Sequence, residues 1–304
     1  MKIDVISGFL GAGKTTFLNK ILPYLSGNTV IIENEYGDIA VDGSLVEDDL
    51  PVKEIMAGCI CCSLVMDFQK AIKELSAKYH PERIIIEPSG VSCLSDVVKA
   101  CERVKDEVQG GLEIDRLITI VDITAFEEYI ENFGVFYGNQ IENANTIFFS
   151  HLNNLEQSDL DNVLSKIREI NSSAAVWHQD WYRQDGMILA EWLKGLSDNQ
   201  ESVAAPDLKR VIFNAHDVFG SWSAVNEKTW TKTDLENLFA ALKSGEYGRI
   251  LRAKGILKAE NGSAVNFNFT PFNQEYHHVK SAQSGKVAVI GCQLDGDKLT
   301  GLFA

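Results

Sequence analysis

The sequence has little that would mark it as a membrane, secreted or nucleic-acid-binding protein. Its apolar runs fall well short of the ~20 residues that a membrane-spanning helix requires. An apolar, core-like segment begins at Ile3, so we expect no signal peptide. Lysine and arginine number 28 against 43 acids, a net charge of −15. Because phosphate backbones attract basic surfaces, this acidic chain is not expected to bind nucleic acid. With no membrane-spanning run and no signal peptide expected, we predict a cytoplasmic protein that does not bind a membrane.

Cysteine is scarce and unevenly placed. The 304 residues include six cysteines, too few to indicate a disulfide framework in a cytoplasmic chain of this size. Three of them, Cys59, Cys61 and Cys62, fall within four positions, which requires a separate explanation. Internal repeats and low-complexity tracts are absent, and the length is typical of about two globular domains.

A complete phosphate-binding loop lies near the start of the chain. Residues 8–15 read G-F-L-G-A-G-K-T, after a predicted strand at Ile3–Ile6 and before a predicted helix at Thr16–Leu25. In this pattern, backbone N–H groups point at a polyphosphate, Lys14 reaches the β and γ oxygens, and the Thr15 hydroxyl ligates Mg²⁺. The strand–loop–helix context favours this interpretation over a chance glycine-rich turn. The predicted nucleotide-binding residues of the loop are Gly8, Gly11, Ala12, Gly13, Lys14, Thr15 and Thr16.

Apolar runs alternate with helix-like segments through the first 200 residues. Runs rich in Ile and Val are typical of strands buried on both faces of a parallel sheet. The predicted strands are Ile3–Ile6, Val30–Ile32, Ile84–Ile86, Leu117–Val121, Thr146–Phe149 and Val176–Trp177. The predicted helices between them are Val65–Tyr79, Cys93–Val104, Thr124–Tyr129 and Glu156–Ile170. We therefore predict an α/β fold, with a P-loop NTPase domain and a mainly parallel sheet over residues 1–200.

The pattern changes after about residue 196. A polar stretch at 197–206 is expected as a linker, and residues 207–304 as a small C-terminal α+β domain with a largely antiparallel sheet. Its predicted strands are Val211–Phe213, Ala264–Thr270 and Val287–Gly291, and its predicted helices are Lys232–Leu242 and Asp297–Phe303.

Carboxylates follow two of the predicted strands. The segment 33–38 reads E-N-E-Y-G-D, and Glu33 and Asp38 are candidate ligands for Mg²⁺ or a transported metal. Glu87 ends the strand at Ile84–Ile86, where an acid can polarise the Mg²⁺ shell and orient water. Gly90, three residues later, lets its backbone approach the γ-phosphate and sense hydrolysis. We predict Lys14, Glu87 and Gly90 as the catalytic set.

The C-I-C-C cluster at 59–62 has residue types suited to Zn²⁺ or Cu⁺. Tetrahedral zinc requires four ligands, and this short motif supplies at most three, so the remainder must come from elsewhere. An incomplete site is suited to a metal that is carried and released. A redox pair and buried small hydrophobic residues are the alternatives.

Together these motifs resemble the CobW-type GTPases, in the superfamily of the nickel-insertion GTPases of urease and hydrogenase maturation. The resemblance rests on the segments S-G-F-L-G-A-G-K-T-T (7–16), E-N-E-Y-G-D (33–38), G-C-I-C-C-S (58–63), E-P-S-G (87–90) and R-A-K-G (252–255). It implies GTP, Mg²⁺ and Zn²⁺ or Co²⁺ as cofactors, and a client metalloprotein or cofactor enzyme as partner. It leaves a homodimer open. By motif position, the family's metal ligands correspond to Cys59, Cys61 and Cys62, with Glu33 and Asp38 at its acidic positions.

One segment departs from the family pattern. Relatives read guanine with N-K-x-D after the fifth strand, where this chain has Ser150, His151, Leu152 and Asn153. An aspartate accepts both guanine N–H donors, whereas the Asn153 amide has only one oxygen. An unpaired base donor costs ~1–3 kcal/mol. We therefore expect Ser150, His151 and Asn153 to contact the base with relaxed or altered preference.

The sequence thus predicts a nucleotide-dependent, GTP-hydrolysing metallochaperone. One alternative is a nucleotide switch that activates or remodels a cofactor-dependent enzyme, with structural or redox-active cysteines. Another is a metal sensor or buffer with weak turnover.

Overall fold

The computed structural model describes residues 1–36, 52–57, 63–108, 110–153, 155–199, 215–260, 262–279 and 285–304. These residues form two compact units, and each contains its own β-sheet. The predicted domain boundary at 200–207 lies outside the described residues, so that boundary remains a prediction. So does the strand predicted at 211–213.

The first unit is built on a seven-stranded sheet. Its strands are β1 (Lys2–Gly8), β2 (Thr29–Tyr36), β3 (Val52–Ala57), β4 (Arg83–Glu87), β5 (Glu113–Asp122), β6 (Thr146–Ser150) and β7 (Ala175–Trp177). They lie in the order β3-β2-β4-β1-β5-β6-β7. The pairs β2–β4, β4–β1, β1–β5, β5–β6 and β6–β7 are all parallel, which confirms the predicted α/β fold.

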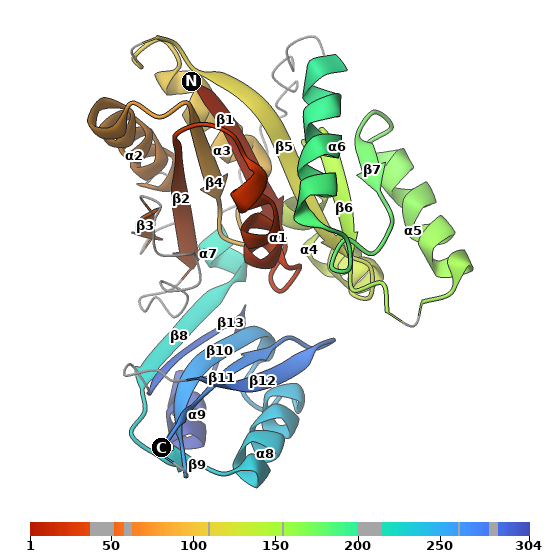
Figure 1. Cartoon of the computed structure of the whole chain (residues 1–304). Helices are drawn as coiled ribbons and strands as arrows, with labels where there is room; N and C mark the ends of the chain where they lie inside the picture. The colour runs from red at the N-terminus through yellow and green to blue at the C-terminus, as the bar shows by residue number, and fades with distance from the viewer. Residues whose placement is uncertain are drawn as a thin grey trace. The chain divides into compact units, whose positions relative to one another are not determined.

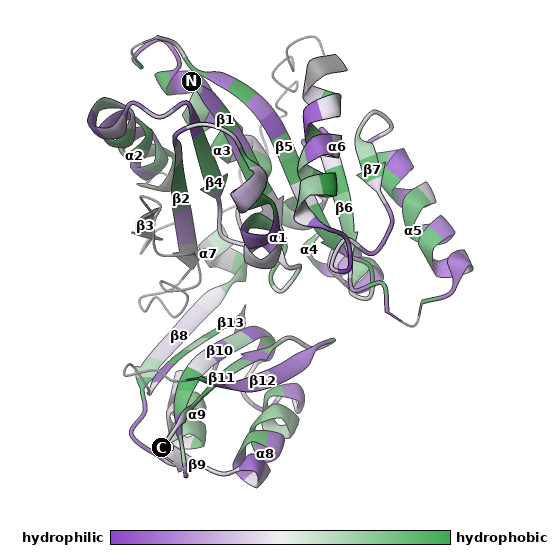
Figure 2. Cartoon of the chain, viewed as in Figure 1, coloured by the Kyte–Doolittle hydropathy of each residue, from purple (hydrophilic) through white to green (hydrophobic). Residues whose placement is uncertain are grey.

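Helices cover both faces of this sheet (Figure 1). They are α1 (Lys14–Ile21), η1 (Leu22–Tyr24), α2 (Ser63–Tyr79), α3 (Leu94–Val104), α4 (Phe126–Glu142), α5 (Gln157–Ile170) and α6 (Gly186–Asn199). On one face, Phe17 of α1 and Leu189 of α6 lie in one buried cluster with Ile118 of the sheet. Figure 2 shows hydrophobic residues along the central strands and a mixture of hydrophobic and hydrophilic residues on helices such as α5 and α6. None of the helices in the described part of the chain is long and apolar enough to cross a membrane.

Helix α4 extends thirteen residues beyond the helix predicted at Thr124–Tyr129, and it begins at Phe126. Its aromatic residues Tyr129, Phe133 and Tyr137 recur every four positions, so they lie on one face of the helix. All three pack against Phe9 of the phosphate-binding loop, with ring centroids 4.6–5.7 Å apart. The sequence did not predict this extension, because Gly134, Gly138 and Glu131 interrupt the apolar spacing.

Helix α6 was not predicted, and it corrects the expected linker at 197–206. Residues 197–199 are its last residues, and the rest of that stretch lies outside the described residues. The helix buries Leu189 and Leu193 in the same cluster as α1. Tertiary packing therefore extends the helix into a stretch whose polar composition suggested a connection.

The second unit is α+β, as predicted. Its elements are α7 (Ala215–Val218), β8 (Gly220–Val225), β9 (Thr229–Trp230), α8 (Lys232–Lys243), β10 (Arg249–Ala259), β11 (Ala264–Phe269), β12 (Gln274–Val279), β13 (Lys286–Cys292) and α9 (Gly296–Phe303). The sheet order is β12-β11-β10-β13-β8, and these four pairs are antiparallel, whereas the short β9 pairs parallel with β10. Strands β8, β10 and β12 were not predicted from the sequence.

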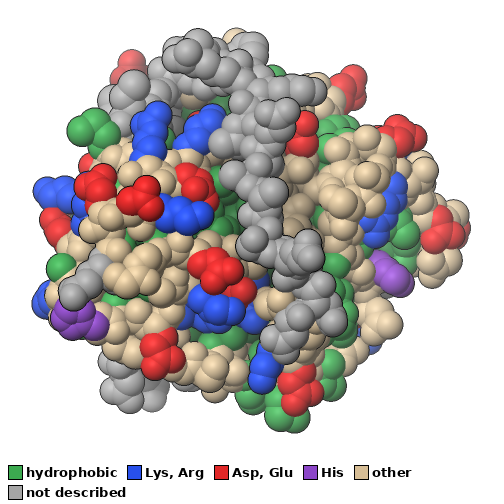
Figure 3. All heavy atoms as spheres, turned by 90° about the horizontal axis from the view of Figure 1, so that it is seen from above, with side chains coloured by type: hydrophobic (Ala, Val, Ile, Leu, Met, Phe, Trp, Pro, Cys, Tyr) green, Lys and Arg blue, Asp and Glu red, His purple; other side chains and the backbone are tan. Residues whose placement is uncertain are grey.

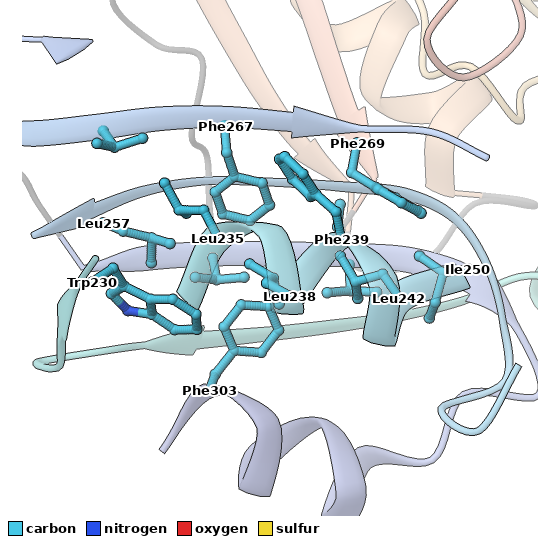
Figure 4. Close-up of a cluster of buried hydrophobic side chains, with 14 of the residues drawn as sticks. Trp230, Leu235, Leu238, Phe239, Leu242, Ile250, Leu257, Phe267, Phe269 and Phe303 are labelled. Atoms are coloured by element: carbon cyan, nitrogen blue, oxygen red, sulfur yellow. The ribbon is translucent and has the colours of Figure 1, made fainter. Parts of the chain in front are cut away.

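The core of the second unit lies between one face of its sheet and helices α8 and α9. Phe239 of α8 packs against Phe267 and Phe269 of β11, with ring centroids 6.2 and 6.0 Å apart (Figure 4). Leu235 and Leu238 of α8 belong to the same buried cluster. A Thr231–Asp234 capping box begins α8, because the Thr231 hydroxyl accepts from the Asp234 backbone N–H and the Asp234 carboxylate accepts from Thr231.

Candidate nucleotide-binding site

The predicted site residues of the first unit gather at the carboxyl edge of its sheet. Strands β1, β4, β5 and β6 end at Gly8, Glu87, Asp122 and Ser150. The strands are parallel, so these ends share one edge, where open α/β sheets bind ligands. The register places Glu33 beside Glu87 and Asp122 beside Ser150.

The phosphate-binding loop connects β1 to α1, and its backbone needs glycine. Gly13 begins α1 with φ 98°, and a Cβ at this position would lie 2.5 Å from the hydroxyl oxygen of Tyr182. The N-cap residue Gly13 has no side chain that could cap α1. The backbone N–H groups of the first turn can therefore bind an anion. Phe9 anchors the loop, because its buried ring packs against Tyr129 of α4.

Lys14 and Thr15 lie at the first turn of α1, where the motif requires them. The buried Lys14 ammonium donates to the carbonyls of Gly8, at 3.0 Å, and Phe9, at 3.4 Å. Thr15 Oγ1 donates to Glu87 Oε1 at 2.8 Å. A hydroxyl and a carboxylate oxygen in direct contact are hard donors of the kind that Mg²⁺ prefers, so these two residues fit that ion.

A second carboxylate lies on the strand beside Glu87. Glu33 of β2 pairs in register with Glu87 of β4, and both side chains are buried. The other predicted metal ligands, Asp38, Cys59, Cys61 and Cys62, lie outside the described residues. Within the described part of the chain, no group of three or more His, Cys, Asp or Glu residues is placed to hold a metal ion. The metal-binding prediction therefore remains a prediction.

Gly90 packs directly against the phosphate-binding loop. A Cβ on Gly90 would lie 2.7 Å from the backbone nitrogen of Leu10, so a larger residue would displace one of the two segments. The buried Gln140 side chain of α4 donates to the carbonyls of Gly90, at 3.0 Å, and Ser92, at 2.9 Å. Gln140 thus fixes the turn after β4. The sequence alone assigned Gln140 no role, because the two segments are 50 residues apart.

The residues that replace the guanine-reading motif follow β6. Ser150 is fully buried, and its hydroxyl donates to the Val121 carbonyl at 3.3 Å. His151 has φ 58°, a left-handed conformation that is uncommon without glycine, and its Nδ1 lies 3.3 Å from Asp122 Oδ2. Asn153 is exposed.

Tyr182 is a further candidate that the sequence analysis missed. Its ring centroid lies 6.1 Å from that of His151, and its ring stacks on Trp181 at 3.9 Å. Its hydroxyl lies close to Gly13, so this one side chain reaches both the phosphate-binding loop and the loop after β6. In the sequence, the adjacent aromatic residues Trp181 and Tyr182 in the loop after β7 could have indicated this role.

Two cysteines outside the C-I-C-C cluster are chemically inert. Burial raises the pKa of Cys93 to about 12 and the pKa of the fully buried Cys101 to about 12. Both stay protonated at neutral pH, whereas metals bind thiolates.

A comparison with known proteins identifies relatives for the first unit. A family model described as the CobW/HypB/UreG nucleotide-binding domain matches residues 2–178. The chain is 36% identical to a zinc chaperone CobW of Sinorhizobium sp over 132 residues, which are 40% of this chain and 36% of that protein. It is 29% identical to the zinc chaperone YjiA of Escherichia coli K12 over 186 residues, 58% of this chain and 56% of that protein.

Among solved structures, the Zn(II)-bound YjiA GTPase from E. coli aligns with 100% of this chain and 98% of that chain, at 18% identity and a TM-score of 0.44. HypB from Helicobacter pylori in complex with nickel aligns with 66% of this chain, at 15% identity and a TM-score of 0.47. The chain spans only about a third to just over half of the length of the curated relatives named above. The family model, however, runs from β1 to β7 and covers more than half of the 304 residues, so the chain belongs to the CobW/HypB/UreG nucleotide-binding family.

Proposed function

We propose that this protein is a GTP-hydrolysing metallochaperone that binds Zn²⁺ or Co²⁺ and delivers it to a client metalloprotein or cofactor enzyme. The observation that carries the proposal is the 2.8 Å contact between Thr15 and Glu87. It joins the phosphate-binding loop to the strand end that lies in register with Glu33, at the start of the acidic segment. Two relatives at 29–36% identity are zinc chaperones by name, which supports the metal half of the proposal.

The nucleotide half follows from the loop. Backbone N–H groups of Gly11, Ala12 and Gly13 and the first turn of α1 surround the phosphates, with Gly8 and Thr16 flanking them. Lys14 exchanges its two loop carbonyls for phosphate oxygens. Thr15 and Glu87 would hold Mg²⁺, which would supply positive charge to neutralise the transferring phosphoryl group. Glu87 also accepts a hydrogen bond from the attacking water and so orients it.

We assign the base to the loops after β6 and β7. His151 and Tyr182 present aromatic rings there, and such rings stack on purines. Ser150 supports the loop from within through its contact with Val121, and the Asn153 amide faces solvent-accessible space. Because Asn153 offers one acceptor where an aspartate offers two, the preference for guanine is weak.

The chain connectivity couples the nucleotide to the metal. Strand β2 carries Glu33 and leads toward Asp38, while the C-I-C-C cluster lies between the end of β3 at Ala57 and the start of α2 at Ser63. Gly90, held against Leu10, shifts when the γ-phosphate is lost, and β4 transmits that shift to its neighbour β2. Metal affinity must therefore differ between the nucleotide states if hydrolysis is to drive transfer.

A zinc titration tests this proposal. The purified chain is titrated with Zn²⁺ in three states: with Mg²⁺ and a non-hydrolysable GTP analogue, with Mg²⁺ and GDP, and without nucleotide. We expect the zinc Kd to differ by about tenfold between the first two states, within the usual range of coupling. Cys61→Ser should weaken zinc binding in every state, whereas Cys101→Ser, at a buried inert thiol, should not. Equal affinity in all states, or no effect of Cys61→Ser, would refute the proposal.

A further inference from the structure

A second cavity lies at the opposite edge of the first sheet, where the parallel strands begin. It has a volume of about 570 Å³ and is bounded by the starts of β1 and β4, by β5, by the segment after η1, and by α6. Strand β1 has seven residues, so the cavity is ~20 Å from the phosphate-binding loop. It is thus separate from the candidate nucleotide site.

Positive charge dominates the cavity wall although the chain carries a net charge of −15. Four cations line it, Lys2, Arg83, Arg116 and Lys194, against one acid, Glu82. Asp4 and Asp115 do not line the cavity but contact its arginines. When these two aspartates are included, four cations still face three acids. Figure 3 views the molecule from the side on which β1 begins and shows basic and acidic side chains gathered on that face.

The two arginines are held in place by the aspartates. Arg83 Nη1 donates to Asp4 Oδ2, at 2.5 Å, and to Asp115 Oδ2, at 3.1 Å, and Arg116 Nη1 donates to Asp4 Oδ2 at 3.3 Å. Arg116 Nε also donates to the hydroxyl of Ser197, which lines the cavity. These contacts use Nη1 of Arg83 and Nε and Nη1 of Arg116. A guanidinium has five N–H donors in a planar fork, so each arginine retains donors for a ligand.

A β-bulge creates this arrangement. Ile3 of β1 pairs with Ile114 and the next residue, Asp4, pairs with Arg116, so Asp115 is an extra residue in β5. Bulges redirect side chains and occur frequently beside binding sites. Here the bulge brings consecutive residues, Asp115 and Arg116, into one buried cluster with Arg83.

The cavity has lining residues that an ion cluster with a purely structural role would not need. Lys194 of α6 is exposed and, within the described part of the chain, has no ion-pair partner. The hydroxyls of Ser26 and Ser197 add polar contacts, and Leu25 and Tyr24 add apolar surface. Ligand cavities typically have volumes of ~300–1,000 Å³ with a few convergent polar groups, which this cavity matches.

We propose that this cavity, formed by Lys2, Arg83, Arg116 and Lys194, binds a small organic dianion through its carboxylate or phosphate groups. Arg83 and Arg116 provide the forked donors that match these oxygens. At the rim, Lys194 adds one charge, and Lys2, which also pairs with Asp115 at 3.2 Å, adds a second. The site is independent of the proposed metallochaperone function, because it uses none of the phosphate-binding or metal-binding residues.

Calorimetric titration of the full chain tests the proposal, with succinate and inorganic phosphate as separate probes at constant ionic strength. The protein is saturated with GDP and Mg²⁺ so that neither probe enters the phosphate-binding loop, and the Lys14→Ala variant without nucleotide repeats the measurement. We expect saturable binding of one or both probes. Binding of succinate alone identifies a carboxylate ligand, and binding of phosphate alone a phosphate ligand.

Two variants locate the binding. Lys194→Gln, on the exposed face of α6, should weaken the probe by about tenfold. Lys166→Gln, an exposed lysine of α5 that pairs with Glu127, is the matched control and should change nothing. Arg83→Lys keeps the charge beside Asp4 but removes the fork, and it should also weaken the probe while thermal unfolding confirms a folded chain. Absence of binding to both probes, or binding that Lys194→Gln and Arg83→Lys leave intact, would overturn the proposal.

Discussion

Glu87 connects the end of β4 to the phosphate-binding loop. Its carboxylate ends β4 and accepts from the hydroxyl of Thr15, so it contacts the first turn of α1 directly. A glutamine keeps the size and one oxygen acceptor but loses the charge that orients water and holds Mg²⁺.

Substituting Glu87→Gln should therefore lower the rate of nucleotide hydrolysis by about a hundredfold, a typical value for loss of a general base. Nucleotide affinity measured without Mg²⁺ should change little, because the phosphates are then bound by Lys14 and the loop backbone. Phosphate release and fluorescent-nucleotide binding measure the two effects. Glu113→Gln, at the exposed start of β5, is the control, and a Glu87→Gln protein with normal hydrolysis would contradict the proposed role.

Asn153 and His151 determine how well the base is recognised. Asn153→Asp supplies the second acceptor for the guanine N–H donors, and His151→Lys supplies the aliphatic stem that usually covers the base. The double variant should raise the preference for GTP over ATP by about ten- to a hundredfold. Competition of GTP, ATP and XTP against a fluorescent nucleotide measures this preference. Strong selection of GTP by the unmodified chain would show that Asn153 is already sufficient.

At the scale of elements, the turn between β4 and α3 depends on a helix 50 residues further along the chain. Gln140 of α4 donates to two carbonyls of this turn, and its backbone carbonyl accepts from the Thr119 hydroxyl of β5 at 2.7 Å. The turn in turn packs against Leu10. Helix α4 thus supports the phosphate-binding loop twice, through Gln140 and through its aromatic contacts with Phe9.

Gln140→Leu should destabilise the protein by about 1–3 kcal/mol, because it leaves buried carbonyls without a donor. It should also slow hydrolysis at temperatures where the chain remains folded, since the Gly90 turn loses its support. Asn171→Leu is a matched control, because Asn171 is also a buried amide that donates to backbone carbonyls, of Ile141 and Ala144. Both variants should lower Tm. Equal hydrolysis rates in the two would limit Gln140 to a structural role.

Helix α8 provides a pH-dependent test in the second unit. The Thr231 side chain, and then its backbone N–H, hold the pKa of Asp234 below its ordinary value. A lowered folded-state pKa stabilises the helix above the unfolded-state pKa of ~3.9, and this contribution is lost as the pH falls through the folded-state value.

Thr231→Ala should cost about 1 kcal/mol near neutral pH, a typical value for a lost N-cap. The cost should shrink as the pH falls through the lowered folded-state pKa of Asp234, where its carboxylate becomes protonated. Denaturant unfolding between pH 2.5 and pH 7 measures it, with the exposed Thr233→Ala on the same helical turn as the control. A cost that is constant over this range would show that Asp234 does not contribute through the capping box.

At the scale of the whole molecule, two separate cores support two units. In the first unit, apolar residues of α1 and α6 pack on the parallel sheet; in the second, those of α8 and α9 pack on the antiparallel sheet. We expect fragments 1–200 and 207–304 to fold independently. Circular dichroism and cooperative thermal unfolding test both, and fragment 1–200 should bind GDP within about threefold of the full chain, since its site is complete. An unfolded fragment, or loss of GDP binding, would show that the units depend on each other.

Local motifs made much of this protein predictable. The phosphate-binding loop is continuous in sequence, and a carboxylate after an Ile-rich strand indicates the sheet edge, so Lys14, Thr15 and Glu87 were identifiable without a structure. Helix α8 was also predictable, because its cap and apolar spacing are local. In contrast, β10 mixes charged and apolar residues over eleven positions and becomes a central strand only through its pairing with β11 and β13.

The sequence by itself determined the fold class, the phosphate-binding loop and the altered residues at 150–153, since each depends on residue types at fixed short spacing. Only the tertiary structure decided which distant side chains meet them. Gln140 reaches the Gly90 turn, Tyr182 reaches Gly13, and Arg83 and Arg116 meet around Asp4, because strand order and a β-bulge bring together segments that spacing along the chain does not relate.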